Sequence, residues 1–392
     1  MAAALEGILV LDFTRLLPGP FATQLLCDLG ADVIKVEDPS VGDYMRAVPP
    51  TVQGVPYPFA MVNRGKRSIA VDLKTPEGQE IVHRLAARAD ILVEQFRPAV
   101  MARLGADYAT LSRINPRLLY CAFSGYGQTG PAKDRPGHDL NFEALAGILG
   151  VTGDRDRRPV IPGVPMADLA SGFNAALAIL AALRVRDRTG RGAFVDVSIF
   201  DTAIALMVLN LAHYLGTGEM PAPGETIVSG QWPFYNIYET KDGRWISVAA
   251  VEPKFWERLV EVLGLPELAA EQFTDVQGRQ RGIAMLQQRF LTKTLEEWED
   301  LVGKDLPCAR LATLAEVVAD PQLRARDMLV DVDLGPAGRR KVVGHPAHHE
   351  GVRKDRPSSV PAKGEHTDEI LRSLGYSARK IAELRGQGIV GP

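Results

Sequence analysis

The chain has 392 residues, of which 46% are hydrophobic and 24% charged, and its formal net charge is −3. This composition predicts a globular protein of two or three domains, and its charge favours neither nucleic acid nor an anionic membrane as a partner. We expect no signal peptide, because no basic segment precedes a long apolar core, and no membrane span, because no run of 18 apolar residues occurs. Its three cysteines are far apart in the chain, which argues against disulfides and zinc and favours the reducing cytoplasm.

Apolar runs of strand length alternate with helical segments over the first 124 residues. Strands are expected at 8–13, 31–38, 67–73, 90–96 and 118–124, with helices at 21–30, 76–89 and 97–105. Because parallel strands need crossover connections, this alternation predicts an α/β domain with a Rossmann-like parallel sheet.

The pattern changes in the second half of the chain. Two apolar helices are expected at 139–150 and 168–187, followed by a buried strand at 193–201, a Gly/Pro-rich linker at 216–233 and a hairpin at 234–250 around Asp242-Gly243. Helices and short strands then continue to about residue 330. We expect a large α/β domain over 1–224, a smaller α+β domain over 225–330, and a segment, 331–392, that returns to the large domain.

The stretch GYGQTG, residues 125–130, fits the G-x-G-x-x-G pattern of dinucleotide-binding proteins. That pattern binds pyrophosphate only where its loop opens directly into a helix. Here Pro131 and Pro136 follow within seven residues and exclude a regular helix. We therefore interpret the stretch as a glycine-rich turn and expect no nicotinamide or flavin cofactor.

Three titratable residues stand at the starts of predicted helices. His138 precedes Asp139 in GHDLN, Asp168 lies in VPMADLASG, and Glu252 lies in VAAVEPKFW. A helix start offers unpaired N–H groups that could hold an oxyanion. Asp and Glu are equally ordinary capping residues there. The spacing alone leaves both interpretations open and does not show that the three residues converge.

Several stretches resemble family III CoA-transferases (the CaiB/BaiF superfamily), which include the α-methylacyl-CoA racemases. The resemblance runs essentially from end to end. Its motifs are LDFTRLLPGPFATQLLCDLGADVIKVEDP, NRGKRSIAVDLKTPEG, VEQFRPAV, GYGQTGP, TGRGAFVDVSIFD and GEHTDEIL. The family implies a two-domain fold, an interlocked homodimer and an acyl-CoA substrate, with no metal and no tightly bound cofactor apart from the coenzyme A of the thioester.

Within the family, GHDLN and VAAVEPKFW resemble the racemase branch. The resemblance implies that His138 and Asp168 transfer the α-proton of a 2-methylacyl-CoA, that Glu252 supports His138, and that the backbone N–H of Asp139 meets the enolate. The alternatives are a CoA-transferase with Asp168 as nucleophile and a non-catalytic acyl-CoA binding protein.

The resemblance also predicts contacts to coenzyme A. Lys74 and Arg97 follow two of the predicted strands, at the edge where open α/β sheets bind ligands. Two positions depart from the racemase pattern: Asp38 stands where similar racemases carry an arginine, and Phe142 where they carry a tyrosine.

Overall fold

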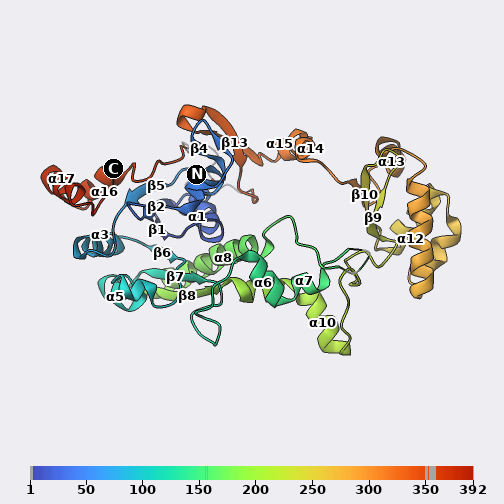
Figure 1. Ribbon diagram of the computed structural model, residues 1–392, viewed down its shortest axis with the longest axis horizontal. Coiled ribbons are helices and arrows are strands. Elements are labelled where there is room, and N and C mark those ends of the chain that lie inside the picture. Colours follow the sequence, from blue (N-terminus) through green and yellow to red (C-terminus); the bar gives the residue numbers. More distant parts are fainter. Residues whose placement is uncertain (1–2, 155, 157, 349–351, 353–358, 392) are drawn as a thin grey trace. The chain divides into compact units, whose positions relative to one another are not determined.

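The computed structural model describes residues 3–154, 156, 158–348, 352 and 359–391. The chain forms two compact units (Figure 1). The first contains the chain up to Ala146, then Val164–Leu206, and the chain from Pro321 onward; the second contains Gly147–Gly163 and Met207–Asp320. The chain thus leaves the first unit after Leu206 and re-enters it at Pro321. The domain boundaries expected from the sequence stay a prediction.

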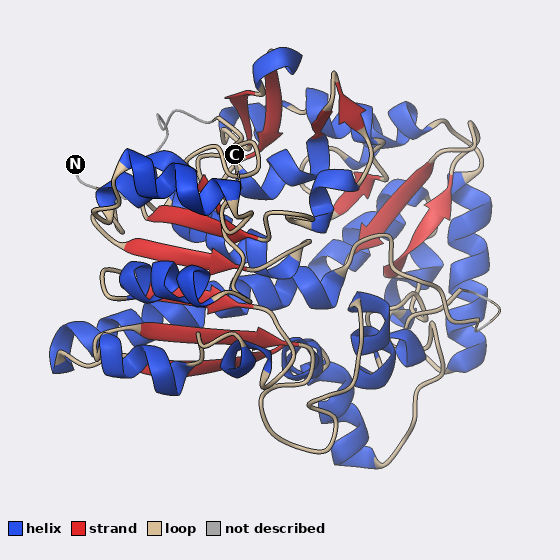
Figure 2. Cartoon of the chain, turned by 60° about the vertical axis from the view of Figure 1, so that its left-hand side comes forward, coloured by secondary structure: helices blue, strands red, loops and turns tan. Residues whose placement is uncertain are grey.

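A six-stranded parallel sheet forms the centre of the first unit (Figure 2). Its strands are β1 (Leu9–Phe13), β2 (Asp32–Glu37), β5 (Arg67–Ala70), β6 (Ile91–Glu94), β7 (Leu119–Ser124) and β8 (Ala193–Ser198). They lie in the order β5-β2-β1-β6-β7-β8, which is the order of the doubly wound dinucleotide-binding fold. The predicted Rossmann-like sheet is confirmed. The strand order reverses between β1 and β6, where such sheets form a crevice at their carboxyl edge.

Helices cover both faces of this sheet, so its strands are buried on both sides. Leu11 and Phe13 of β1 join one apolar core with residues of α3, α5, α16 and α17. Asp12, between them, faces the other side and contacts Thr23 of α1. The helices of the unit are α1 (Pro18–Asp28), α2 (Tyr57–Asn63), α3 (Pro76–Ala86), α4 (Val100–Arg103), α5 (Tyr108–Ile114), α6 (Asp139–Ala146), α8 (Met166–Thr189), α9 (Ile199–Leu206), α15 (Pro321–Ala325), α16 (Thr367–Ser373) and α17 (Ala378–Gly386).

Short elements complete the first unit. Two antiparallel pairs, β3 with β4 and β12 with β13, lie around a small core that contains Ala60 and Val332. The bounds are β3 (Thr51–Val52), β4 (Val55–Pro56), β12 (Leu329–Asp333) and β13 (Arg339–Val343), with 3₁₀ turns at Tyr44–Ala47 and Gly335–Ala337.

The second unit is built on a three-stranded antiparallel sheet with a core rich in aromatic residues. The predicted hairpin is confirmed, with β9 (Tyr235–Glu239) and β10 (Trp245–Ala249) joined through Asp242-Gly243. Tyr238, Trp256 and Trp298 are buried beside this sheet. The other elements are β11 (Cys308–Arg310), α7 (Ile148–Val151), α10 (Val208–Thr217), α11 (Pro253–Leu263), α12 (Val276–Phe290), α13 (Leu295–Val302), α14 (Leu314–Ala319) and a 3₁₀ turn at Pro266–Glu271.

Two predicted helices differ from the observed ones. The helix expected at 139–150 is divided into α6 and α7 because Gly147 takes a φ of +88°, a left-handed conformation that ends α6. The helix expected at 97–105 is reduced to the four residues of α4, which follow the left-handed Ala99. The helix α5 was not expected.

Helix α8 is long and apolar enough to cross a membrane by length and composition alone, and α9 and α10 pass the same test together but are bent by 66° at the break between them. The core helices of globular proteins pass the same test. Helix α8 packs against α1, α6, α9 and β8 within the first unit. It is therefore weak evidence for a span, and the described residues contain no clear one.

Candidate active site

His138 sits directly before α6. Its backbone carbonyl accepts the N–H of Asn141 at 2.8 Å, and its own N–H donates to the Asn141 Oδ1 at 3.0 Å. These reciprocal bonds fix the backbone at the helix start and leave the imidazole exposed. Asp139 is the first residue of α6, so its backbone N–H has no acceptor within the helix. A role of this helix start in holding an oxyanion stays a prediction.

The glycine-rich stretch before His138 has a packing role. A Cβ atom at Gly125 or at Gly137 would lie 2.8 Å from the Phe142 ring. Both residues can lie against this ring only because they lack a side chain. The stretch shapes the approach to α6, in agreement with its interpretation as a turn.

The start of α8 is held by α6. Pro165, the N-cap residue of α8, makes no side-chain capping bond. The N–H of Met166 donates instead to the Glu143 Oε1, and the N–H of Asp168 donates to the Asp139 Oδ1, each at 3.0 Å. Asp168 is therefore not the cap of its own helix, and its carboxyl group is left for another role.

Asp168 carries a strongly perturbed carboxyl group. Burial, followed by the negative charges of Asp139 and Glu143, raises the pKa of Asp168 from its ordinary value of 3.8 to about 7. A carboxyl group with this pKa is present near neutral pH both as an acid and as a base, which is the property that a proton-transfer residue needs.

Glu252 lies in the second unit, whereas His138, Asp139 and Asp168 lie in the first. It is the N-cap residue of α11, where its backbone carbonyl accepts the N–H groups of Phe255 at 2.9 Å and Trp256 at 3.1 Å. Its exposed carboxylate makes no capping bond. The capping interpretation thus does not account for the Glu252 side chain, whose partnership with His138 stays a prediction.

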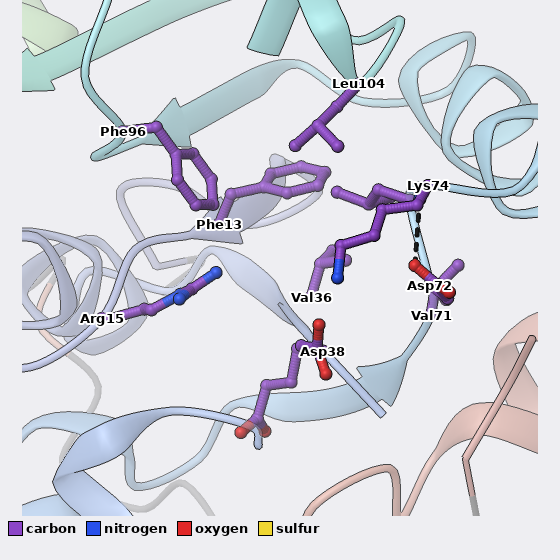
Figure 3. Close-up of a pocket in the computed structure, with 11 residues that line it drawn as sticks. Phe13, Arg15, Val36, Asp38, Val71, Asp72, Lys74, Phe96 and Leu104 are labelled. Atoms are coloured by element: carbon purple, nitrogen blue, oxygen red, sulfur yellow. Dashed lines mark hydrogen bonds between the residues drawn. The ribbon is translucent and has the colours of Figure 1, made fainter. Parts of the chain in front are cut away.

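A pocket opens at the carboxyl edge of the sheet, beyond β1, β2 and β5 (Figure 3). Figure 3 shows Arg15 and Lys74 pointing into it from opposite sides, with Asp38 between them. Lys74 lines the pocket, whereas Arg97 is exposed and is not part of its lining; their contacts to coenzyme A stay a prediction. The lining residues are Phe13, Arg15, Val36, Glu37, Asp38, Val71, Asp72, Leu73, Lys74, Phe96 and Leu104.

The charges of this pocket are held in defined positions. Arg15 stacks over the Phe96 ring at 5.0 Å. Burial works to raise the pKa of Asp38, but hydrogen bonds from Ser40 and Val41 together with the charge of Lys74 outweigh it and hold that pKa below its ordinary value. The pocket therefore presents two cationic side chains, Arg15 and Lys74, and three acidic ones, Glu37, Asp38 and Asp72, to a ligand.

Buried ion pairs support the loop after β1. Lys66 and Asp12 are fully buried, with Nζ and Oδ2 3.0 Å apart, and Lys66 also donates to Thr23 and Asn63. Lys35 pairs with Asp43 at 2.8 Å. The other Asp43 oxygen accepts the N–H of Leu16, which takes a left-handed φ of 61°. These pairs fix the loop that carries Arg15.

The described residues contain no group of three His, Cys, Asp or Glu side chains that could hold a metal ion.

The model of CoA-transferase family III matches residues 5–367. The chain belongs to this family. Relatives in this family are named for activities on CoA thioesters. The chain is therefore a member of a family of acyl-CoA enzymes.

Relatives in family III carry more than one activity. The chain is 35% identical to succinyl-CoA:glutarate CoA-transferase of Homo sapiens, over 98% of this chain and 90% of that protein. It is 33% identical to α-methylacyl-CoA racemase of Homo sapiens, over 99% and 97%. A crystal structure of a CaiB/BaiF family protein from Brucella suis matches with a TM-score of 0.83 and 34% identity, over 95% of this chain and all of that one.

Sequence reasoning missed two features of this family III site. Glu143 is only 1% exposed, although a glutamate within a helix usually indicates a solvated face. The second feature is the buried ion pair of Asp12 and Lys66. Both residues lie in family motifs, but they are 54 residues apart in the chain, so the sequence does not show that they meet. The available signal for buried charge is a charged residue inside each apolar run, Asp12 in β1 and Lys35 in β2.

Proposed function

We propose that the chain is a racemase of 2-methylacyl-CoA thioesters. The observation that carries this proposal is the carboxyl group of Asp168, whose pKa is raised to about 7. The residue is joined through its backbone N–H to Asp139, the neighbour of His138. Racemisation needs two groups that each act as acid in one direction and as base in the other. A pKa near neutrality suits that exchange.

The proposed reaction is a proton transfer across the α-carbon. One of the two groups, His138 or Asp168, takes the α-proton, and the C–H electron pair delocalises into the thioester carbonyl to give an enolate. The other group then delivers its proton to the opposite face, and the substrate of the other hand requires the reverse roles. The N–H of Asp139, unpaired within its helix, is our candidate for holding the enolate oxygen.

A CoA-transferase is the second candidate, favoured by the names of several relatives. There the Asp168 carboxylate would attack the thioester carbonyl, release the CoA thiolate and form a mixed anhydride. This step needs the ionised carboxylate. A raised pKa reduces the ionised fraction at neutral pH, so the electrostatics support the proton-transfer role. A non-catalytic acyl-CoA binding protein would need none of these features.

Proton exchange in D₂O tests the proposal. The protein is incubated with (S)-2-methylacyl-CoA and no carboxylic acid acceptor, and the α-proton is followed by NMR. The expected result is deuterium uptake with formation of the (R) thioester, which is lost in His138→Ala and Asp168→Asn. If CoA moves to added carboxylic acids and the α-proton does not exchange, the chain is a transferase.

Coenzyme A is proposed to bind at the carboxyl edge of the sheet, with Lys74 and Arg97 as phosphate contacts. Lys74 has the stronger support because it lines the pocket. An ammonium group attracts phosphate as a point charge.

A cytoplasmic homodimer of the interlocked type is also proposed. Apolar side chains on two helices of the chain support it: Leu177 of α8 is 67% exposed and Leu215 of α10 is 79% exposed. Large apolar side chains that are exposed to this extent mark an interaction surface. Sedimentation velocity should give twice the 42.6 kDa mass of one chain. A species of one chain mass at micromolar concentration would contradict it.

A further inference from the structure

One edge of β5 is covered by the C-terminal segment, residues 359–391. β5 is an edge strand of the six-stranded sheet, with β2 on its other side. At Ser68 the segment meets the strand through a single residue, His366. The Ser68 carbonyl accepts the His366 N–H at 2.9 Å, and the Ser68 N–H donates to the His366 Nδ1 at 3.2 Å. The imidazole nitrogen thus takes the place of the carbonyl that a neighbouring strand would supply.

The same segment pairs with the rest of this edge. The Ala70 N–H donates to the Thr367 Oγ1 at 3.3 Å, and the Ala70 carbonyl accepts the Gly391 N–H at 3.0 Å. The Asp72 N–H donates to the Ile389 carbonyl at 2.8 Å. Backbone groups that an edge strand would otherwise leave open are therefore paired from Ser68 to Asp72.

The His366 side chain is needed because the chain turns at this point. Helix α16 begins at Thr367, so the segment cannot continue along β5 as a strand. Ser68 is fully buried, and a buried N–H without an acceptor is costly. An imidazole Nδ1 accepts a hydrogen bond only when it carries no proton, which places the proton of the neutral ring on Nε2.

This edge continues into the pocket at the carboxyl end of the sheet. The pocket lining includes Val71, Asp72 and Lys74, and the Lys74 N–H donates to the Asp72 Oδ1 at 2.9 Å (Figure 3). A second part of the lining is connected through Ser68. Its hydroxyl accepts a backbone N–H of the C-terminal segment at 2.9 Å and donates to the Glu37 Oε1 at 2.7 Å. The C-terminal segment thus supports lining residues that follow β5 and one that ends β2.

We propose that His366 is a positioning residue for the coenzyme A pocket: by accepting the Ser68 N–H it holds the C-terminal segment on β5 and fixes the strand end that leads to Lys74. The consequence for binding rests on the proposed binding of coenzyme A in this pocket, whereas the bond at the strand edge does not.

Two substitutions separate the acceptor from the bulk of the side chain. His366→Asn keeps an acceptor oxygen near the place of Nδ1, whereas His366→Leu keeps an apolar side chain of similar volume and removes the acceptor. Amide hydrogen exchange of residues 67–73, followed by mass spectrometry, reports on the strand edge. Calorimetry with coenzyme A reports on the pocket, and the exchange of the α-proton gives kcat.

We expect His366→Leu to speed amide exchange at residues 67–73 and to weaken coenzyme A binding about tenfold, as the loss of one hydrogen bond would. The kcat should be nearly unchanged, because the contact is equally present in substrate complex and transition state. His366→Asn should restore both properties to within about twofold of the wild type. Arg372→Met, which removes an exposed ion pair with Asp368 from the same helix, is the matched control and should change neither.

Other results decide against the proposal. Faster amide exchange in His366→Leu with unchanged coenzyme A binding would mean that His366 protects the strand edge alone. Unchanged amide exchange would show that the bond to Ser68 contributes nothing. A loss of kcat with unchanged binding would place the effect on the chemistry instead of the pocket.

A failure of the coenzyme A site is distinguishable from a failure of this bond. If the wild type does not bind coenzyme A, or if Lys74→Ala binds it equally well, the proposed site is wrong, and amide exchange in the His366 variants still decides whether the edge bond exists. If His366→Leu does not fold, ¹⁵N NMR of the imidazole decides, with the signal identified by its loss in His366→Asn. Nδ1 should appear as the unprotonated nitrogen and Nε2 as the protonated one, and a proton on Nδ1 would overturn the proposal.

Discussion

The N–H of Asp168 donates to the Asp139 Oδ1 at 3.0 Å, which joins the first turn of α8 to the first residue of α6. Asp139 also follows His138 directly in the chain. The bond therefore connects, through one side chain, the two residues proposed to transfer the α-proton. A displacement of either helix start would change the relation of both groups to a substrate, and small displacements in active sites have large effects on rate.

Asp168→Asn should lower the rate of α-proton exchange by about 10² to 10⁴, because the amide can neither accept nor deliver the proton. The loss should appear in kcat, with little change in the binding of a CoA thioester, since the amide has nearly the shape of the carboxylic acid. Stopped-flow or NMR exchange rates measure kcat, and calorimetry measures binding. Retained exchange at the wild-type rate would remove Asp168 from the chemistry.

The same substitution should change the dependence of stability on pH. Folding raises the pKa of Asp168 from 3.8 to about 7, so the folded state binds this proton more tightly than the unfolded state. The resulting stability is fully present below the unfolded value and is lost as the pH rises toward 7. Asp168→Asn should therefore unfold at higher denaturant concentration than the wild type at pH 8, by about 1–3 kcal/mol.

The comparison must be repeated at low pH to attribute this effect. At pH 4 the wild-type Asp168 is protonated, and the two proteins should be nearly equal in stability. A constant difference between the two proteins at both pH values would indicate changed packing instead of titration.

Lys74→Ala and Arg97→Ala form a matched pair of substitutions. Lys74 lines the pocket at the sheet edge, whereas Arg97 is exposed outside its lining. Lys74→Ala should raise KM for the acyl-CoA about tenfold with little change in kcat, because a phosphate contact made equally in substrate and transition state affects binding alone. Arg97→Ala should change KM less. The reverse order would place the phosphates nearer to Arg97.

Asp38→Asn tests one of the acidic side chains that line the same pocket. The carboxylate of Asp38 stays ionised because Ser40, Val41 and Lys74 stabilise its charge. Removing that charge should strengthen the binding of a phosphate-bearing ligand and lower KM, with the largest effect at low salt. An increase in KM would mean that Asp38 accepts a hydrogen bond from the ligand.

The sequence predicts the first unit well because buried parallel strands appear as continuous apolar runs. All six of its strands are predicted near their observed positions, and the βαβ opening follows from that signal. It does not predict the end of α6 at Gly147, because the glycine lies inside a periodic apolar segment. Nor does it predict the burial of Glu143, which arises only when α8 packs its first turn against α6. Helix-start carboxylates are visible in a sequence, but their partners in space are not.

The buried pair of Lys66 and Asp12 should be important for stability. Both side chains are fully buried, with Nζ and Oδ2 3.0 Å apart. Lys66→Met leaves a buried carboxylate with fewer donors and should cost about 3–5 kcal/mol of unfolding free energy, whereas a double variant with Asp12→Asn should lose less than the sum of the single changes. Arg379→Met, which removes an exposed partner of Glu383, is the control and should cost less than about 0.5 kcal/mol. Urea unfolding of the wild type, the two single variants and the double variant measures the coupling, and additive losses would show that Lys66 and Asp12 act separately.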